Sequence, residues 1–439
     1  MQTMMTSFRP WLLLGLTAGL GFAQAPAGRP ELSLSEAIRI ALENNLSLSL
    51  AQDQTAQAAN AREAGAGNFL PSASASLSNS GPLPLNGTAP VTTLGASANW
   101  LVFDGFQDYH AYRRLQSQEK TASLQERMSV ESLLETVVVA YYDLVQQKQR
   151  LAAINDLLTV SQERARLAQA KLEVGAGSKL DQLQSMADLN QDSSTFLSQS
   201  VAMATAKVRL NQVLARDAAL DFDVADSIPL EPSLPLDAWG KNLKDNNASI
   251  AAAKAQKNAS AYGVEEARGR WLPSLNTGIG YSTAPEALNS SRAVTGRDGF
   301  SYSVNLSVPL FDRLATPTAV RQAKLGLRGD ETRLRQAEDQ AAADFEQARR
   351  QYEIGRRQIA LEERNLQVAR LQAEAALERY KVGVTSPLEF RDAQTKLLDA
   401  EGRWITARQS VKQSEAARQR LAGALIKQVP AQANPPGGK

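Results

Sequence analysis

The chain has no cysteine and a single histidine, His110, among its 439 residues. Without a thiol it can form no disulfide, bind no metal through thiolate ligands, use no cysteine nucleophile and carry no thioether-linked lipid. One histidine leaves little scope for zinc or copper ligation, or for acid–base catalysis near neutral pH. We therefore expect no catalytic residue, no metal and no cofactor. Of the possible functions, an exported hydrolase has the least support from the sequence.

Strong charge of one sign is also absent, since 48 Lys and Arg balance 46 Asp and Glu. This balance argues against a nucleic-acid-binding surface. The longest apolar run, Trp11 to Phe22, has about 12 residues where a spanning helix needs about 20. It follows Arg9 and ends near Ala23-Gln24-Ala25, a pattern typical of a cleaved secretory signal. We predict a signal peptide at 1–25 and no transmembrane helix in the mature chain, with a membrane anchor as the alternative.

The second half of the chain repeats motifs of the first half. Phe103-Asp104 returns as Phe311-Asp312, and Val174-Gly175 returns as Val382-Gly383, in both cases 208 positions later. Equal spacing leaves no net insertion or deletion between the two motifs, which indicates one rigid element in each half. The chain is thus predicted to contain two copies of one structural unit.

We expect a first repeat at 26–216, a linker at 217–236, a second repeat at 237–427 and a disordered tail at 428–439. The change in apolar period along each repeat predicts a helix, a β-hairpin, a long helix and a shorter helix. The first helix of each repeat is expected at 33–63 and from Asp237 to about residue 268. The other predicted bounds are hairpins at 69–104 and 271–311, long helices at 105–174 and 317–382, and shorter helices at 178–216 and 386–427.

Apolar residues alternate with small polar ones after Phe69-Leu70-Pro71-Ser72 and after its counterpart Trp271-Leu272-Pro273-Ser274, which predicts four strands. Strands of about 10 to 13 residues with this pattern are typical of membrane-spanning β-strands, although soluble sandwiches also contain them. Four strands cannot close a barrel, and an open edge in lipid leaves backbone groups unpaired. Two copies would supply eight strands around a filled interior, whereas three supply twelve and leave a lumen, so we favour a homotrimer.

The long helices carry an apolar residue at every seventh position, the pattern of a coiled-coil seam. A second apolar stripe lies about 200° around each helix at roughly 100° per residue. Two seams on nearly opposite sides predict two neighbouring helices, as in the wall of a helical cylinder. The first stripe contains Val137, Leu144, Leu151, Leu158, Ala165 and Leu172, matched by Phe345, Tyr352, Ile359, Leu366, Ala373 and Tyr380. The second contains Ala153, Val160, Leu167 and Val174, matched by Leu361, Val368, Ala375 and Val382.

The long and shorter helices of each repeat are joined by two similar turns. Gly175 and Gly383 stand just past a helix end, while Ser178 and Ser386 stand at the next N-cap. Glycine here serves mainly the backbone geometry of the turn. The two turns are predicted to form the end of the helical rod opposite the strands.

Taken together, these features resemble the TolC-like outer-membrane efflux proteins over essentially the whole mature chain. The resemblance is carried by the signal peptide, the duplicated helix–hairpin–helix unit, the Leu-Pro-Ser motifs before the strands and the two V-G-x-x-S turns. It implies an α+β fold with two internal repeats and four strands per chain. In such a fold a homotrimer forms a membrane β-barrel, which a long α-helical coiled-coil barrel continues into the periplasm.

The resemblance also implies a function. The protein would be a channel in the outer membrane that exports small molecules or secreted polypeptides, as the exit duct of a tripartite efflux or type I secretion system. Its implied partners are outer-membrane lipid, a periplasmic adaptor protein and an inner-membrane efflux pump or ABC transporter. The alternative is a periplasmic or surface coiled-coil protein that conducts nothing and stays soluble without detergent.

Specific residues at the turns take their implied roles from the same resemblance. Glu389 and Asp392 match an acidic pair that rings the periplasmic entrance, and Asp181 and Tyr380 match a pair that holds the tips closed. For either acid of the ring alone, stabilisation of the helix N-terminus is the simpler interpretation. Val384-Thr385 stands where some members of the family have a basic residue. The implied adaptor-docking residues are Val174, Gly175, Ser178, Val382, Gly383 and Ser386.

Overall fold

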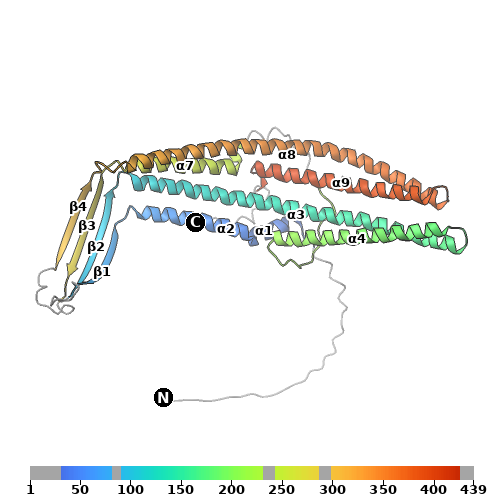
Figure 1. The fold of residues 1–439 in the computed structure, drawn as a ribbon, viewed down its shortest axis with the longest axis horizontal. Coiled ribbons are helices and arrows are strands. Elements are labelled where there is room, and N and C mark those ends of the chain that lie inside the picture. Colours follow the sequence, from blue (N-terminus) through green and yellow to red (C-terminus); the bar gives the residue numbers. More distant parts are fainter. Residues whose placement is uncertain (1–30, 82–89, 231–242, 286–297, 426–439) are drawn as a thin grey trace, which may run out of the picture.

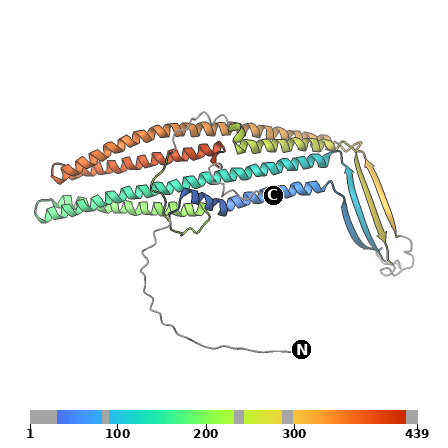
Figure 2. The same cartoon turned by 180° about the vertical axis from the view of Figure 1, so that it is seen from behind.

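A four-stranded sheet lies at one end of a long rod of helices (Figure 1). The computed structural model describes residues 31–81, 90–230, 243–285 and 298–425. The predicted signal peptide 1–25, the predicted helix start at Asp237 and the predicted tail 428–439 lie outside these residues. The reverse view shows the same helices running from the sheet to two turns at the far end (Figure 2).

The sheet is antiparallel and follows the chain order β1-β2-β3-β4. Because β2 pairs with β3, the two predicted hairpins merge into one sheet with β1 and β4 at its edges. β4 ends before residue 311, the predicted end of the second hairpin, since Pro309 has no N–H to donate to a neighbouring strand. The strands are β1 (Ser72–Ser80), β2 (Val91–Phe103), β3 (Ser274–Thr283) and β4 (Gly299–Ser307).

The helices repeat with the spacing of the sequence motifs. α3 and α8 have 67 residues each and start 208 positions apart, and α4 and α9 have 35 residues each with the same offset. The predicted α+β fold is confirmed. Among the described residues, no helix combines the length and the apolar character that a membrane crossing requires. The helices are α1 (Leu34–Asn44), α2 (Leu46–Gly67), α3 (Gln107–Glu173), α4 (Lys179–Val213), α6 (Leu243–Asn246), α7 (Ala248–Gly269), α8 (Ala315–Lys381) and α9 (Pro387–Leu421).

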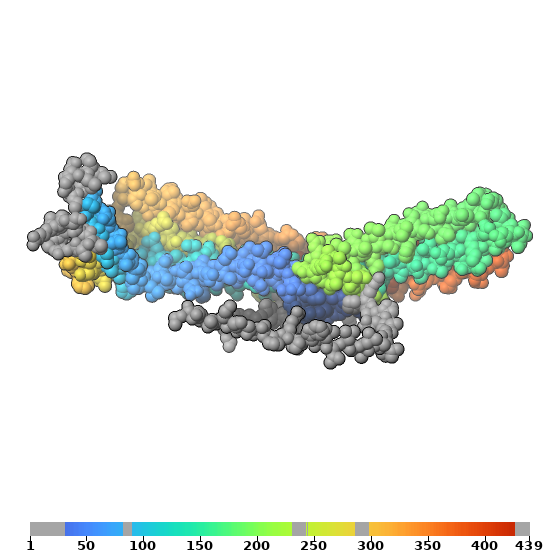
Figure 3. All heavy atoms as spheres, turned by 90° about the horizontal axis from the view of Figure 1, so that it is seen from below, coloured from blue at the N-terminus to red at the C-terminus, as the bar shows by residue number. Residues whose placement is uncertain are grey.

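The helix predicted over 33–63 is interrupted at Asn45, which separates α1 from α2. The Asn45 side chain accepts hydrogen bonds from the N–H groups of Ser47 and Leu48, and it donates one to the Val213 carbonyl at the end of α4. A residue that caps one helix and binds the end of another thus joins α2 and α4 end to end. Figure 3 shows these two helices following one another along the rod.

The second repeat contains the same joint at Asn247. Its side-chain oxygen caps α7, and its amide donates a 3.2 Å hydrogen bond to the Leu421 carbonyl at the end of α9. We expect Asn247→Ala to lower the free energy of unfolding by about 2 kcal/mol, because it removes an N-cap and leaves a buried carbonyl unpaired. Urea denaturation of the detergent-solubilised protein measures this loss. Asn155→Ala, at an exposed site in α3, is the control, and an equal loss there would contradict the role of the joint.

The helices form four rows across the chain. α3 packs against α2 and α4 on one side and against α7 and α9 on the other, while α8 packs against α7 and α9. The row of α2 and α4 and the row of α8 are therefore the two outer rows. The first apolar stripe is largely buried within the chain, and Val137, Leu144, Phe345 and Tyr352 are among its buried residues.

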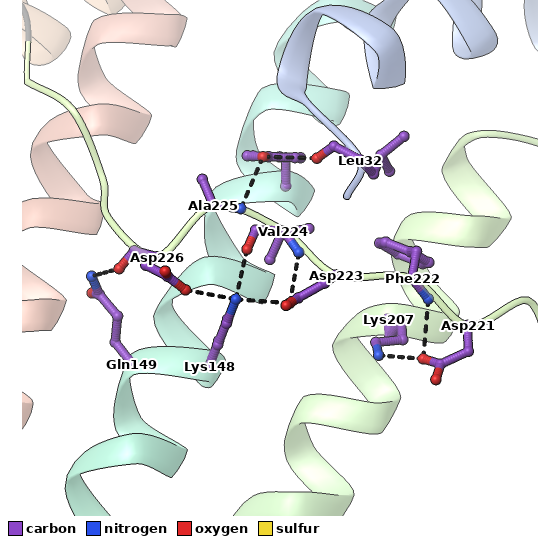
Figure 4. Close-up of polar contacts among 11 residues, drawn as sticks. Leu32, Lys148, Gln149, Lys207, Asp221, Phe222, Asp223, Val224, Ala225 and Asp226 are labelled. Atoms are coloured by element: carbon purple, nitrogen blue, oxygen red, sulfur yellow. Dashed lines mark hydrogen bonds and ion pairs between the residues drawn. The ribbon is translucent and has the colours of Figure 1, made fainter. Parts of the chain in front are cut away.

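Part of the predicted linker is packed onto the rod. Phe222, Val224 and Ile228 are fully buried in the main hydrophobic cluster, beside Tyr141 of α3. Lys148 of α3 binds this segment through the Val224 carbonyl at 2.8 Å and through two carboxylates, Asp223 at 2.8 Å and Asp226 at 2.7 Å (Figure 4). Burial opposes the charge of Lys148, but these hydrogen bonds outweigh it and raise its pKa. Residues 217–230, called the belt below, thus cross the middle of the rod from α4 over α3 to α9.

Candidate functional site

The candidate site is the pair of turns at the far end of the rod, residues 174–178 and 382–386, called the tips below. Gly175 and Gly383 have φ values of 73° and 78°, a region that favours glycine. Their N–H groups bond to carbonyls of the preceding helix, Leu172 in the first tip and Tyr380 in the second. The two tips therefore have the same backbone structure, as their matching sequences predict.

Each tip ends at a serine that caps the next helix. The Ser178 hydroxyl accepts a hydrogen bond from the Asp181 N–H at 3.0 Å, and the Ser386 hydroxyl accepts one from the Glu389 N–H at 3.2 Å. Val174 and Val382, which precede the glycines, are 79% and 73% exposed. The tips thus present apolar side chains and bare glycine backbone to their surroundings, which suits contact with another protein.

The structure brings Asp181 and Tyr380 close together across the two repeats. Tyr380 is buried against Phe390, whose ring stacks on it at 5.1 Å, and the Lys171 ammonium lies 5.3 Å from the Tyr380 ring centre. Burial raises the pKa of Tyr380, and the neighbouring Asp181 carboxylate adds to the rise. However, neither the Tyr380 hydroxyl nor Asp181 Oδ1 makes a hydrogen bond of normal geometry. The Tyr380 ring is therefore held by packing on Phe390, and Asp181 acts on Tyr380 through its charge.

Glu389 and Asp392 lie exposed on the first turns of α9. The Glu389 carboxylate closes a capping box by accepting the Ser386 N–H at 3.4 Å. Asp392 forms an ion pair with Lys396 at 2.6 Å. Each acid thus already has a partner within its own helix, and Lys396 places a positive charge beside the predicted acidic ring.

A second charged cluster near the tips was not predicted from the sequence. Arg391 of α9 donates two 2.7 Å hydrogen bonds to the two carboxylate oxygens of Asp192 in α4, which is 4% exposed. Ser161 of α3 donates a third hydrogen bond to the same carboxylate. The bonds to Asp192 raise the pKa of Arg391. This bidentate pair directly connects the α8–α9 hairpin with the α3–α4 hairpin.

The cluster continues toward Tyr380. Arg164 of α3, also 4% exposed, binds Asp188 of α4 at 2.6 Å, and Asp188 lies 4.0 Å from Arg391. No sequence pattern could have identified the pair of Arg391 and Asp192, because 199 residues separate the partners and each is one charged residue among many on its helix. We call Ser161, Arg164, Asp188, Asp192 and Arg391 the inter-hairpin cluster.

An apolar groove separates the hairpins beside this cluster. It has a volume of about 240 Å³ and lies between α3 and the α8–α9 hairpin. Ala153 and Val160, which belong to the second predicted stripe, line one wall, and Phe390 and Leu397 line the other. At this level the charged cluster joins the two hairpins, while the apolar side chains beside it line an open groove.

His110, the lone histidine, stands in the first turn of α3, where its ring lies 5.3 Å from that of Tyr109 in a T-shaped arrangement. Within the described part of the chain, no group of three or more His, Asp or Glu side chains has an arrangement that could hold a metal ion.

Residues 234–424 match the family model described as "Outer membrane efflux protein". The chain is 25% identical over 335 residues to the outer membrane efflux protein BepC of Brucella suis, an alignment that covers 75% of this chain and 72% of BepC. It is 28% identical over 319 residues to protein CyaE of Bordetella pertussis, covering 71% of this chain and 64% of CyaE.

Among solved structures, the fold is similar to that of the CmeC outer membrane channel of Campylobacter jejuni. The TM-score is 0.79 with 18% sequence identity, and the match covers 97% of this chain and 98% of the other. At that identity the likeness concerns the fold, and it extends over the sheet and all rows of helices.

Proposed function

Because this chain belongs to the TolC-like outer-membrane efflux proteins, we propose that three copies of it form one continuous export duct across the outer membrane and into the periplasm. The duct carries small molecules or secreted polypeptides outward. The similarity to outer-membrane channels argues against the alternative of a coiled-coil protein that conducts nothing.

The observation that carries the proposal is the open sheet. Its edge strands β1 and β4 have no further strand beside them in the described chain, and one face is rich in exposed apolar side chains such as Phe300, Tyr302 and Val304. In lipid, the backbone groups of both edges need partners. Pairing β4 of one copy with β1 of the next satisfies both edges, and three copies close a twelve-stranded barrel around a lumen.

The helices support the same closure. Exposed apolar residues run along both outer rows, on α8 at Ile354, Leu361 and Val368, and on α4 at Leu197 and Val201. The residues that the structure describes therefore leave the second predicted stripe of α8 exposed, at Leu361, Val368 and Val382. In a closed trimer, α8 of one copy would lie beside α4 of the next and cover both rows.

We expect the detergent-extracted protein to have three times the mass of the mature chain. Light scattering combined with absorbance, which separates the detergent contribution, measures this mass. The same preparation should conduct ions in planar bilayers. A protein that stays monomeric, dissolves without detergent and leaves bilayers non-conducting would contradict the proposal.

The tips are the proposed periplasmic entrance and its gate. Asp181 and Tyr380, together with the inter-hairpin cluster, hold the α8–α9 hairpin against the α3–α4 hairpin and keep the entrance narrow. Glu389 and Asp392 of three copies form the acidic ring at that entrance and favour cations there.

The proposed partners are a periplasmic adaptor and an inner-membrane efflux pump or ABC transporter. The adaptor would contact the tips at the docking residues implied by the sequence, where the valines are exposed and the glycine backbone is open. Those residues are Val174, Gly175, Ser178, Val382, Gly383 and Ser386.

A further inference from the structure

We propose that the strand part of the duct does not discriminate its cargo by charge, so that anionic and cationic solutes pass it equally well. The inference rests on the proposed trimeric duct, because it concerns the face of the sheet that would line the lumen. It assigns any charge preference of the protein to parts of the duct outside the strands.

The register of the sheet defines the two faces. Ile279 pairs with Tyr302 and Tyr281 with Phe300 on the apolar face, whereas Ser97 pairs with Ser74 on the other face. In a membrane barrel the apolar face contacts lipid, so the polar face lines the lumen. On that face β1 and β2 present Ser72, Ser74, Ser76, Ser78, Ser80, Val91, Thr93, Gly95, Ser97, Asn99 and Leu101, and β3 and β4 present Ser274, Asn276, Gly278, Gly280, Ser282, Gly299, Ser301, Ser303, Asn305 and Ser307.

No residue of the four strands carries a charge. The nearest charged side chains among the described residues stand at or beyond the strand ends, at Asp104, Arg270, Asp312 and Arg313 on the helical side and at Asp298 on the loop side. Ser303 occupies the middle of β4, four residues and therefore about 13 Å from either end of the strand. This exceeds the Debye length of about 8 Å at physiological ionic strength, so the charges at the ends are largely screened there.

Several polar side chains of this face bond to one another or to the strand backbone, so they lie along the sheet instead of projecting into the lumen. The hydroxyls of Ser74 and Ser97 are 3.2 Å apart, and the Ser301 hydroxyl donates to the Gly280 carbonyl at 3.4 Å. A Cβ at Gly278 would lie 2.8 Å from Asn99 Oδ1 and 2.9 Å from the Ser303 hydroxyl, so these side chains extend over the glycine. The wall is thus a flat layer of hydroxyl and amide dipoles, which can orient toward a solute of either sign.

The absence of cysteine from the chain permits a direct test with single introduced thiols. Ser303→Cys places one on the polar face, and Val304→Cys places one on the adjacent apolar face. Protein in outer-membrane vesicles is treated with methanethiosulfonates that carry either a trimethylammonium or a sulfonate group, and intact mass follows the reaction. For S303C we expect the ratio of the two rates to agree within about threefold with the ratio for a free thiol, because local charge is screened. V304C should react with neither.

Ser301→Asp combined with S303C is the control for sensitivity. The added carboxylates should favour the cationic reagent by about tenfold or more, because a charged lumen concentrates counter-ions. The inference is overturned if S303C alone shows such a bias, or if V304C reacts from water while S303C does not. The mass readout does not depend on conduction. Equal rates in a protein that fails to conduct would therefore reject the duct but support the uncharged wall.

Discussion

Arg391→Ala is expected to loosen the tips and to raise amide hydrogen exchange in the facing segments of α4 and α9 by roughly 100- to 5000-fold. The substitution leaves the Asp192 carboxylate buried without its bidentate partner, and breaking a buried pair in this way costs about 3–5 kcal/mol. Because the pair connects the two hairpins, the same change should increase the conductance of the duct. Exchange followed by mass spectrometry and single-channel recording measure the two effects.

Two further variants show whether the buried pair is the cause. Arg166→Ala removes an ion pair of similar length with Glu163 on the same helix as Ser161, but Arg166 is 74% exposed, so little change is expected. Arg391→Met combined with Asp192→Leu removes both charges, and apolar replacement of a buried pair is often tolerated, so most of the protection should return. If exchange in Arg391→Ala equals that of the unmodified protein, the inter-hairpin cluster does not hold the tips.

Replacing both Glu389 and Asp392 with alanine is expected to abolish the cation preference of the duct and its block by trivalent cations. In the proposed trimer six carboxylates face one axis, and such a site attracts multivalent cations far more strongly than a neutral one. We expect the blocking concentration to rise by about tenfold or more. Reversal potentials in a salt gradient and titration with a trivalent cation measure the two properties in planar bilayers.

Lys396 provides a control that acts in the opposite direction. Its ammonium lies 2.6 Å from the Asp392 carboxylate and offsets part of the acidic charge. Lys396→Gln should therefore strengthen the trivalent block, whereas the double alanine variant weakens it. An unchanged block in the double variant would show that Glu389 serves only the capping box and that Asp392 pairs only with Lys396.

Much of the fold could be predicted from local patterns. The exact offset of the Val-Gly motifs predicted two long helices of equal length, and α3 and α8 have 67 residues each. The glycine and serine positions of both tips were recognisable because their backbone requirements are local. By contrast, Asn45 and Asn247 look like ordinary polar residues within helices, and their role as joints depends on the ends of α4 and α9.

The candidate site was only partly visible in the sequence. Asp181 and Tyr380 could be assigned through the resemblance, and the structure places them near each other without a hydrogen bond. The bond between Arg391 and Asp192 could not be assigned, because nothing in either helix indicates which of its charged residues meets a partner 199 positions away. The belt at 217–230 was expected as a linker, since its buried residues are too few and too irregular to show a period.

What the sequence determined by itself is everything set by short-range geometry: the alternation that forms strands, the seven-residue stripes of the long helices, the turns between helices and the duplication that places each element twice. The tertiary structure decided which stripe is buried within the chain and which stays exposed on the outer rows. It also decided which charges meet across the hairpins and where helices join end to end. The physical reason is that hydrogen-bond ladders and caps act over a few residues, whereas burial and ion pairing depend on the packing of whole helices that are remote in the chain.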